Sequence, residues 1–519
     1  MIRTKGANVA VREIDRTRRK LLKYSGGVFA ASVFLPVNGA AAVRLTAPGE
    51  LTKLSAVDAV TRMRSGDLDA ETYAAALLGR AREKRELNAF ISLDPEKLLA
   101  AARAADLRRA KGETIGTLHG LPIPVKDSVF TEDYPTTAGT AALRKLNHRV
   151  DAPLVARLKA NGAMVMGKTN LHELSTGHTS NNEIFGAVHN PFDPTRIPGG
   201  SSGGTAVAVA TGMAPLGIAE DTFGSIRVPA ALCGVAGFRP TTGRYPSDGV
   251  VPLTPRFDQL GPIARRVADI ILFDRVMTGS SYRDTGPTLD SVRLGVPRGY
   301  FYNGMATETQ AVIDAALKRL EGTGVTLVEA DVPDVKDLIE QFYFPVLNYE
   351  VYPTLDTFLR KAGIPGGLAE VLMQAGPRMR AFYNNALVPG AADAVSRRAY
   401  ENALGTGERL RTVVGDYFSQ HALDAMVFPS TLSAAIPIGD ENETELDGRR
   451  VPTIVAIGNN QAPAPACGLP ALTLPAGLTR SGLPVGIEFT AAPAMDEKLL
   501  TLGLKLEAAL GPLPKTALN

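Results

Sequence analysis

The chain has 519 residues, of which 45% are hydrophobic and 21% charged, values typical of a globular protein with a large core. This composition argues against disorder, and no run of 18 or more apolar residues predicts a membrane span. The net charge is only +3, and its distribution gives no sign of a nucleic-acid-binding surface.

The first 42 residues differ from the rest. Eight Lys or Arg and two acidic residues are followed by an apolar run over residues 26–36 and by Ala40-Ala41-Ala42. This order is typical of a signal peptide, and residues 17–23 resemble the twin-arginine export motif. A frayed basic terminus is the simpler alternative. We expect residues 1–42 to be a leader, the twin-arginine export machinery to be a partner, and the protein to be periplasmic or otherwise exported.

Removing this leader changes the charge balance of the chain. The leader carries a net charge of +6, and because the whole chain carries +3, residues 43–519 carry −3. The basic isoelectric point of about 8.7 is thus largely a property of the leader. We expect residues 43–519 to form a single domain.

Helices are predicted first along this domain, over residues 54–109. Ser55 is a suitable N-cap and Gly66 a suitable stop for the first of them. The next two segments, residues 69–87 and 95–112, are rich in Ala and Leu, with apolar residues at helical spacing.

Short apolar runs then alternate with glycine-rich turns and helix-like stretches over residues 120–262. This alternation predicts an α/β fold with a largely buried sheet. A more helical insert is expected over residues 290–430, where 15 of the 31 aromatic residues lie, and strand patterns return from residue 425 before a last helix. Because both α/β parts flank the insert, we interpret them as one domain.

Two familiar motifs occur in this region without their usual context. Residues 162–169 match the phosphate-binding P-loop pattern, but the intervening Ala-Met-Val-Met predicts a buried strand instead of a flexible loop. Residues 199–203 match the G-x-S-x-G nucleophile elbow, which requires a preceding strand. The preceding residues 190–198 contain three prolines and predict a loop. An α/β-hydrolase using Ser201 and His421 is nevertheless an alternative.

Metal-ligand patterns are weak in this sequence. His172 and Glu173 form the nearest cluster, which we interpret as ordinary polar residues of a helix, so that no metal is expected and a metal-dependent hydrolase is disfavoured. Cys233 and Cys467 are far apart and lack metal-binding spacing. They are predicted to be buried thiols, with a disulfide as the alternative.

Lys126 is the first candidate for chemistry. A lysine becomes a general base near neutral pH only where burial lowers its pKa from about 10.4. Lys126 ends the apolar run of residues 121–126, so its side chain is expected to be buried, whereas the alternative is a surface lysine on a strand.

Two turns supply hydroxyl groups for the same chemistry. Residues 199–204 (GGSSGG) bring two serines close to the backbone, although a purely structural loop is an alternative. Residues 220–227 (EDTFGSIR) place Ser225 just before a helix-like stretch. Consecutive backbone N–H groups in this second turn are suited to bind an oxyanion.

Together these segments resemble the amidase signature family. Lys126, the GGSSGG turn and a serine before Ile-Arg-Val-Pro follow one another at the family's spacing, and similarity continues through residues 459–477 and 482–489. The resemblance covers nearly all of residues 43–519. It implies a single α/β domain with a large mixed, twisted sheet and helices on both faces.

The resemblance also assigns roles to individual residues. It implies that Ser225 is the nucleophile, that Ser201, held by a cis peptide bond after Gly200, relays the proton, and that neutral Lys126 is the base. The oxyanion hole falls on the backbone N–H groups of Thr222, Phe223, Gly224 and Ser225. The supporting residues are Ser202, Asp221 and Arg227. No cofactor is implied, and the partner is a small amide.

The sequence departs from the family pattern at Phe223, where a small residue is usual. We expect its ring to enter the acyl pocket, with a position in the core as the alternative. Residues 237–270 and 437–453 are most similar to indoleacetamide and mandelamide hydrolases, which implies a primary arylacetamide substrate. Two further interpretations are a non-catalytic binding protein and a component of a transamidase that works on charged tRNA. The oligomeric state is left open, with a homodimer as one option.

Overall fold

The computed structural model describes residues 48–144, 150–282 and 286–513. The chain divides into two units, residues 1–45 and 46–519, and all described residues belong to the second. The expected leader over residues 1–42 lies outside the described residues. In the described part of the chain, no helix combines the length and the apolar character that a membrane crossing requires.

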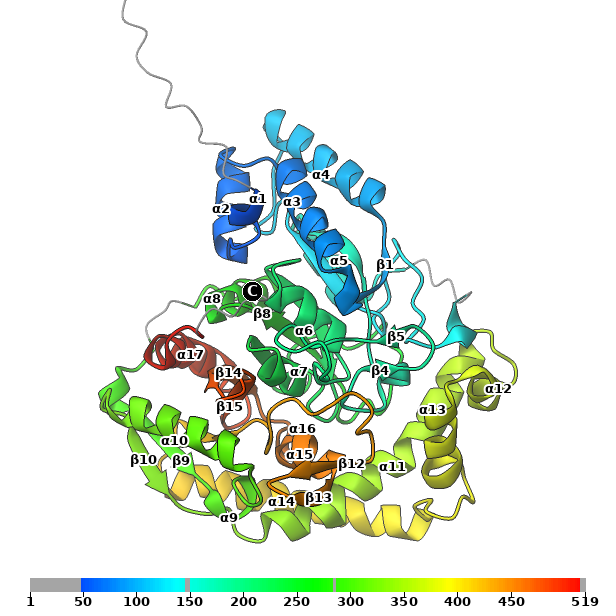
Figure 1. Cartoon of the computed structure of the whole chain (residues 1–519), viewed down its shortest axis with the longest axis vertical. Coiled ribbons are helices and arrows are strands. Elements are labelled where there is room, and N and C mark those ends of the chain that lie inside the picture. The colour runs from blue at the N-terminus through cyan, green and yellow to red at the C-terminus, as the bar shows by residue number, and fades with distance from the viewer. Residues whose placement is uncertain (1–47, 145–149, 283–285, 514–519) are drawn as a thin grey trace, which may run out of the picture. The chain divides into compact units, whose positions relative to one another are not determined.

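One large sheet organises this unit (Figure 1). Its strands are β1 (Phe90–Leu93), β2 (Pro122–Lys126), β3 (Met164–Thr169), β6 (Leu216–Asp221), β7 (Ala236–Arg239), β8 (Gln259–Ala264), β9 (Arg293–Val296), β10 (Thr326–Glu329), β11 (Ala425–Pro429), β14 (Ala471–Leu478) and β15 (Pro484–Thr490). They form an 11-stranded sheet in the order β1-β3-β2-β6-β8-β7-β14-β15-β11-β9-β10. β2 runs parallel to β3 and β6, whereas β6, β8, β7, β14, β15 and β11 pair antiparallel in succession. The expected mixed sheet is confirmed.

Helices cover both faces of this sheet. The remaining helices and strands are α1 (Pro48–Leu51), α2 (Ala56–Ser65), α3 (Ala70–Glu83), α4 (Pro95–Ala110), β4 (Asn181–Asn182), β5 (Gly186–Ala187), α5 (Pro153–Ala160), α6 (Gly203–Ala210), α7 (Arg227–Leu232), α8 (Val267–Thr278), α9 (Arg298–Phe301), α10 (Thr307–Glu321), α11 (Val335–Lys361), α12 (Gly367–Gln374), α13 (Pro377–Phe382), α14 (Arg397–Gln420), β12 (Glu443–Leu446), β13 (Arg449–Pro452), α15 (Thr453–Gly458), α16 (Pro463–Cys467) and α17 (Asp496–Leu510). α6 and α7 pack together on the central strands, and α8, α10 and α17 form a second group against β8, β14 and β15.

The N-terminal helices follow the expected pattern. The Ser55 hydroxyl accepts a hydrogen bond from the Asp58 N–H at 3.0 Å and caps α2, which ends at Gly66 in the left-handed conformation. The strand β1 was not expected within this helical region. Its four half-buried residues pair antiparallel with β3, a long-range contact that local helical spacing gives no sign of.

The segment that matches the P-loop pattern, residues 162–169, contains the strand β3, as expected. β3 is almost fully buried from Met164 to Thr169, so its backbone N–H groups belong to the sheet. Lys168, at the lysine position of the motif, is fully buried and donates hydrogen bonds to the carbonyl of Val129 at 2.6 Å and the hydroxyl of Thr136 at 2.7 Å. A phosphate cradle is therefore excluded at this segment.

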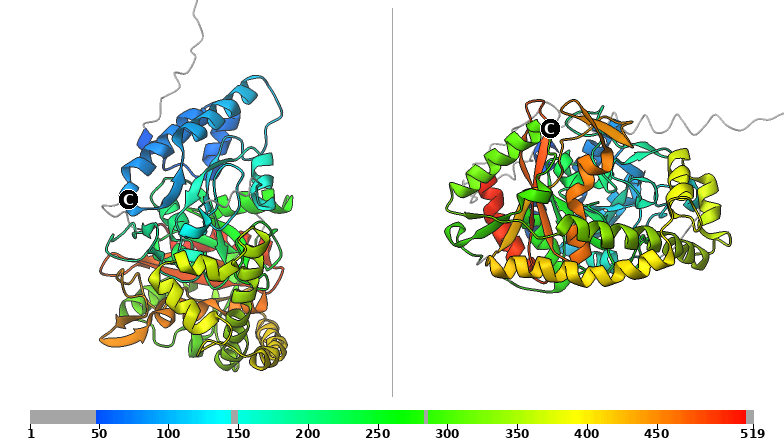
Figure 2. Two further views of the ribbon diagram at one scale, coloured as in Figure 1. Left: turned by 90° about the vertical axis from the view of Figure 1, so that its right-hand side faces the viewer. Right: turned by 90° about the horizontal axis from the view of Figure 1, so that it is seen from below.

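Residues 290–430 are mostly helical, with one difference from expectation. α11 and α14 pack along one another, as Figure 2 shows from below. β9 and β10 also come from this region, and they extend the sheet as a parallel pair beyond β11. The insert thus contributes strands to the sheet as well as helices.

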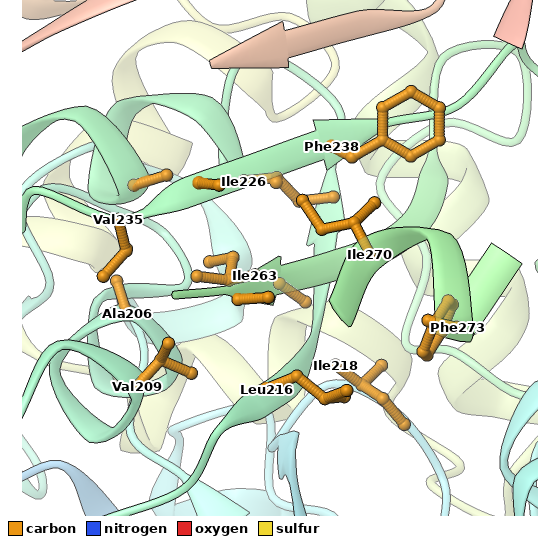
Figure 3. Close-up of a cluster of buried hydrophobic side chains, with 14 of the residues drawn as sticks. Ala206, Val209, Leu216, Ile218, Ile226, Val235, Phe238, Ile263, Ile270 and Phe273 are labelled. Atoms are coloured by element: carbon orange, nitrogen blue, oxygen red, sulfur yellow. The ribbon is translucent and has the colours of Figure 1, made fainter. Parts of the chain in front are cut away.

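A hydrophobic core fixes the two elements that lead to the site (Figure 3). Ala206 and Val209 of α6, Ile218 of β6, Ile263 of β8 and Ile270 of α8 are almost completely buried. Burial of one Val or Ile side chain stabilises a fold by about 1.5–3 kcal/mol. α6 begins just after Ser201 and β6 ends just before Ser225, so this core holds both serine turns in place.

Candidate active site

Lys126 is the last residue of β2 and is completely buried. Its Nζ donates a hydrogen bond to Ser201 Oγ at 2.8 Å and lies 3.3 Å from Glu220 Oε2. Burial lowers the pKa of Lys126, and the negative charge of Glu220 opposes this effect. The alternative of a surface lysine is wrong, and the amine is suited to exchange a proton with Ser201.

Ser201 lies in the glycine-rich turn between a loop and α6. The peptide bond between Gly200 and Ser201 is cis, and the Ser201 side chain is fully buried. Added side chains do not fit here, because a Cβ at Gly203 would lie 2.4 Å from Ser180 Oγ and one at Gly204 2.4 Å from the Ala89 carbonyl. The run of glycines therefore allows this turn to pack against its neighbours.

The nucleophile-elbow alternative is wrong for this turn. The residues before Gly199 form no strand, so Ser201 does not follow the strand that an elbow requires. His421, the histidine proposed as its partner, directly follows α14 as its C-cap, and its ring packs on Tyr417 at 5.3 Å between centroids.

Ser225 lies in the second turn, between β6 and α7. The Asp221 carboxylate accepts hydrogen bonds from the N–H groups of Gly224 at 2.9 Å and Ile226 at 3.1 Å, which folds the turn. Gly224 has a φ of 84°, and a Cβ there would lie 2.5 Å from Gln461. Ser225 is 5% exposed, whereas Lys126 and Ser201 are inaccessible. Of these three candidate catalytic residues, Ser225 is therefore the one that solvent reaches.

Ser202 joins the two turns. Its N–H donates to the Ser225 carbonyl at 3.3 Å, and its hydroxyl donates to the Glu220 carbonyl at 3.2 Å. The side chains of Ser201 and Ser225 make no direct hydrogen bond to each other among the described contacts. Hydrogen bonds of this kind are often long in unliganded enzymes and shorten when substrate binds.

A buried ionic network supports the Ser225 turn. Arg227 pairs with Asp221 at 3.1 Å and with Glu488 of β15 at 2.8 Å, and Arg239 of β7 lies 3.4 Å from Asp221. Burial opposes ionisation of Asp221, but the two arginines outweigh it and hold the pKa of this carboxyl below its usual range. The turn is thus tied to two strands that follow it in the chain.

Several residues that surround Lys126 and the Ser225 turn were not anticipated from the sequence: Glu220, the serines Ser128 and Ser175 that donate hydrogen bonds to its carboxyl, Arg239, Gln461 and Glu488. Glu220, Arg239 and Glu488 do carry a usable signal, because each is a charged residue in or at the end of a short apolar run. A charge at such a position is buried, and buried charges are paired.

Phe223 lies in an aromatic cluster beside the Ser225 turn. Its ring packs on His178 at 4.9 Å and on Tyr343 and Phe344 of α11 at 5.4 Å each. The Tyr343 hydroxyl donates to the Thr222 carbonyl at 2.7 Å, and His178 Nε2 lies 2.6 Å from the Phe223 carbonyl. The side chain is 8% exposed, so the aromatic residues of the insert meet the turn directly.

The two carbonyl contacts orient the peptide groups of this turn. Because a carbonyl and the following N–H share one rigid plane, holding the Thr222 and Phe223 carbonyls also fixes the N–H groups of Phe223 and Gly224. The Gly224 N–H is already bonded to Asp221. An oxyanion at this turn would therefore rely on the N–H groups of Thr222, Phe223 and Ser225.

The histidine cluster and the cysteines have structural surroundings. Glu173 begins a short 3-10 turn, Glu173–Ser175, instead of the expected helix, because Leu174 has a left-handed φ of 51°. His172 Nδ1 lies 3.2 Å from the Thr179 hydroxyl, and within the described ranges no group of three or more His, Cys, Asp or Glu is placed to hold a metal ion. Cys233 and Cys467 are buried free thiols, so the disulfide alternative is wrong.

Comparison with known proteins finds relatives along most of the chain. The protein-family model described as Amidase matches residues 73–500. An indoleacetamide hydrolase from Agrobacterium vitis is 37% identical over 459 residues, 88% of this chain and 97% of that protein. One component of the glutamyl-tRNA(Gln) amidotransferase from Chloroflexus aggregans is 34% identical over 486 residues, 88% of this chain and 96% of that protein. A crystal structure of an amidase aligns with a TM-score of 0.79 at 31% identity, covering 88% of this chain and 100% of its own.

The matches span the whole candidate site, including Lys126, Ser201 and Ser225. They agree with the sequence motifs and with the large mixed sheet that carries them. The chain therefore belongs to the amidase signature family of amide-bond hydrolases.

Proposed function

We propose that this protein is a serine amidase that hydrolyses a carboxamide through an acyl-enzyme on Ser225. The observation that carries the proposal is the 2.8 Å contact between the buried amine of Lys126 and the hydroxyl of Ser201, whose turn is hydrogen-bonded to the turn of Ser225. An amide needs an activated nucleophile and a proton for its departing nitrogen. A neutral lysine that exchanges protons with a serine serves both needs.

In the proposed acylation step, Ser225 Oγ bonds to the amide carbon. Its proton passes to Ser201 while the Ser201 proton passes to the Lys126 amine. The carbonyl oxygen becomes an oxyanion, which the N–H groups of Thr222, Phe223 and Ser225 stabilise. The carbon–nitrogen bond then breaks, the nitrogen takes a proton from Ser201, and Lys126 returns its proton to Ser201.

Water completes the cycle by the same route. It attacks the ester carbon on Ser225 and passes a proton through Ser201 to Lys126 as the new bond forms. The bond to Ser225 breaks, the proton returns to Ser225, and the carboxylic acid leaves. Asp221, Arg227 and Ser202 act by holding the two turns, because their partners are backbone groups and charged side chains and not the hydroxyls of Ser201 and Ser225.

The proposed substrate is a primary arylacetamide, such as indoleacetamide or mandelamide. Similarity to indoleacetamide hydrolases supports this class. The aromatic cluster around Phe223 supports it as well, because aromatic pairs contribute about 0.5–1.5 kcal/mol beyond their burial. Phe223 is the side chain of this cluster nearest in sequence to the nucleophile.

A panel assay of the purified protein tests the function and its substrate class together. Ammonia release is measured with indoleacetamide, mandelamide, phenylacetamide, acetamide and a long-chain fatty amide. We expect the three aryl substrates to have the highest kcat/KM. Preference for acetamide or the fatty amide contradicts the substrate class. Turnover of none of them, or activity only with glutamine and glutamyl-tRNA, favours a binding protein or a transamidase.

We also propose that the protein is exported through the twin-arginine pathway as a folded enzyme. The support is the order of basic, apolar and small residues over residues 1–42. Fusion of these residues to a reporter, with and without Arg18→Lys and Arg19→Lys, tests the proposal. We expect export of the unmodified fusion and cytoplasmic retention of the variant; retention of both contradicts the proposal.

A further inference from the structure

Glu220 is a buried carboxyl that faces the Lys126 amine and has no part in the steps above. It is the penultimate residue of β6 and is 1% exposed. Its Oε2 lies 3.3 Å from Lys126 Nζ and accepts hydrogen bonds from Ser128 Oγ at 2.7 Å and Ser175 Oγ at 3.3 Å. Its Oε1 is buried and has no hydrogen-bond partner among the described residues.

These contacts direct the carboxyl toward the amine. Three groups contact Oε2 of Glu220: Lys126 of β2, Ser128 in the turn after β2 and Ser175 in the turn after β3. The Glu220 side chain is therefore held from three sides. Lys126 in turn has two partners, Ser201 and Glu220. Glu220 therefore fixes the position from which Lys126 reaches Ser201.

The other titratable or charged groups that interact with Lys126 come from separate elements: Asp221 of β6, Asp258 before β8 and His172 after β3. Arg227 and Arg239 pair with Asp221 and offset its charge. Burial lowers the pKa of His172 to about 3, so this ring is neutral near pH 7. Burial, reinforced by the charge of Glu220, raises the pKa of Asp258. Glu220 is the described carboxyl in direct contact with the amine.

We propose that Glu220 is a positioning residue that holds Lys126 toward Ser201 and sets the pH above which the amine accepts a proton. The inference rests on the proposed role of Lys126 as base. Below that pH the pair is an ammonium and a carboxylate, and the amine has no free lone pair. Above it, the ammonium has lost one proton to solvent.

The same contact stabilises the charge that forms during acylation. When Ser225 attacks, the neutral amine takes the Ser201 proton and becomes an ammonium 3.3 Å from the carboxylate. Glu220 thus delays the appearance of the free base as pH rises but stabilises its protonated product.

Labelling of Ser225 by phenylmethanesulfonyl fluoride measures this coupling without a known substrate. The serine oxygen bonds to sulfur, fluoride leaves, and the serine proton passes through Ser201 to Lys126. The rate is followed by intact-protein mass spectrometry from pH 5 to 10 with the full chain, and peptide mapping locates the label. The proteins compared are the wild type, Glu220→Gln and Glu220→Asp.

The acid limb of the pH profile is the range over which the labelling rate rises as Lys126 loses its proton. Loss of the carboxylate should move this acid limb to lower pH. An opposite charge this close shifts a pKa by about 1–3 units, so we expect a shift of about that size for Glu220→Gln. Glu220→Asp keeps the negative charge but places it farther from the Lys126 amine, so it should give a smaller shift in the same direction. This variant carries the test if Glu220→Gln does not fold. An unmoved acid limb in the folded variants overturns the proposal.

Asp274→Asn is the matched control. Asp274 is a buried carboxyl of α8 that pairs with Arg244 at 2.8 Å, and no described contact links it to Lys126. We expect this control to lower stability without moving the acid limb; an equal shift overturns the specific role of Glu220. Absence of label on Ser225 of the wild type contradicts the proposed function and this inference with it, whereas label with an unmoved limb contradicts this inference alone.

Discussion

Two buried lysines, the last residue of β2 and the penultimate residue of β3, have different surroundings. Lys126 of β2 and Lys168 of β3 are both completely buried, and each lies near a buried carboxyl, Glu220 at 3.3 Å and Asp127 at 3.4 Å. Val125, not Lys126, is aligned with Lys168 in the sheet. Because side chains alternate along a strand, the two lysines point to opposite faces.

The difference lies in the partners of each amine other than the carboxyl. Lys168 donates to a backbone carbonyl and to Thr136, groups that hold a loop in place. Lys126 contacts Ser201, in a turn that touches the turn of Ser225. Burial, a carboxylate and a hydroxyl partner are thus shared by both lysines, and what distinguishes the one that we propose to be a base is that its hydroxyl partner, Ser201, lies beside the turn of Ser225.

Replacing Lys126 should have the largest effect on turnover. Lys126→Ala removes the proposed base, and general bases typically contribute about 10²–10⁴-fold to a rate. We expect kcat to fall by at least about that factor, in a protein whose far-ultraviolet circular dichroism is unchanged. Turnover within tenfold of the wild type would show that Lys126, like Lys168, is a structural lysine.

Replacing Lys168 should instead reduce stability. Lys168→Met leaves Asp127 buried without its cation, and breaking such a pair typically costs about 3–5 kcal/mol. We expect a lower urea midpoint and a nearly unchanged kcat per folded molecule. Lys168→Met with Asp127→Asn should regain part of the stability. A loss of kcat comparable with that of Lys126→Ala would break the distinction between the two lysines.

The pH dependence of stability should report Lys168 directly. Burial lowers its pKa from 10.5 to about 8, although the charge of Asp127 opposes this. Between these values the unfolded chain binds more protons than the folded one, so this lysine makes stability rise with pH over that window. We expect urea unfolding at several pH values to show a steeper rise for the wild type than for Lys168→Met. Equal slopes would contradict the lowered pKa.

The smallest expected effect concerns the aromatic wall near Ser225. Phe223→Gly should widen the acyl pocket and change kcat/KM unequally for acetamide and phenylacetamide, if the ring contacts substrate as proposed. The measurement is the ratio of the two kcat/KM values, accompanied by the melting temperature. A lower melting temperature with an unchanged ratio would assign Phe223 to the core alone.

The sequence predicts the parts of the fold that depend on short-range patterns of residues. The cap at Ser55, the stop at Gly66 and the strand over residues 164–169 are short-range features, and the structure has each of them. β1 was missed because four residues between helices gain their strand conformation from pairing with β3, about 75 residues away.

For the same reason, only part of the candidate site could be predicted from the sequence. Lys126 and the two turns are contiguous motifs, and the sequence alone predicts the burial of the lysine. Glu488 and Arg239 reach the Ser225 turn from β15 and β7, and the role of each depends on the sheet order. A charged residue within an apolar strand indicates such a contact but does not identify its partner.

The central claim is that Ser225 is the nucleophile served by Lys126 through Ser201, and Ser225→Ala tests it most directly. The substitution removes one oxygen from a residue that is 5% exposed, so the fold should be preserved. Its kcat is measured at saturating arylacetamide, alone and combined with Lys126→Ala. We expect a loss of several orders of magnitude for the single variant and little further loss for the double, because members of one catalytic unit are not additive. Retention of more than about 5% of the wild-type kcat, far above the residual rates left by removing a catalytic residue, would contradict the account.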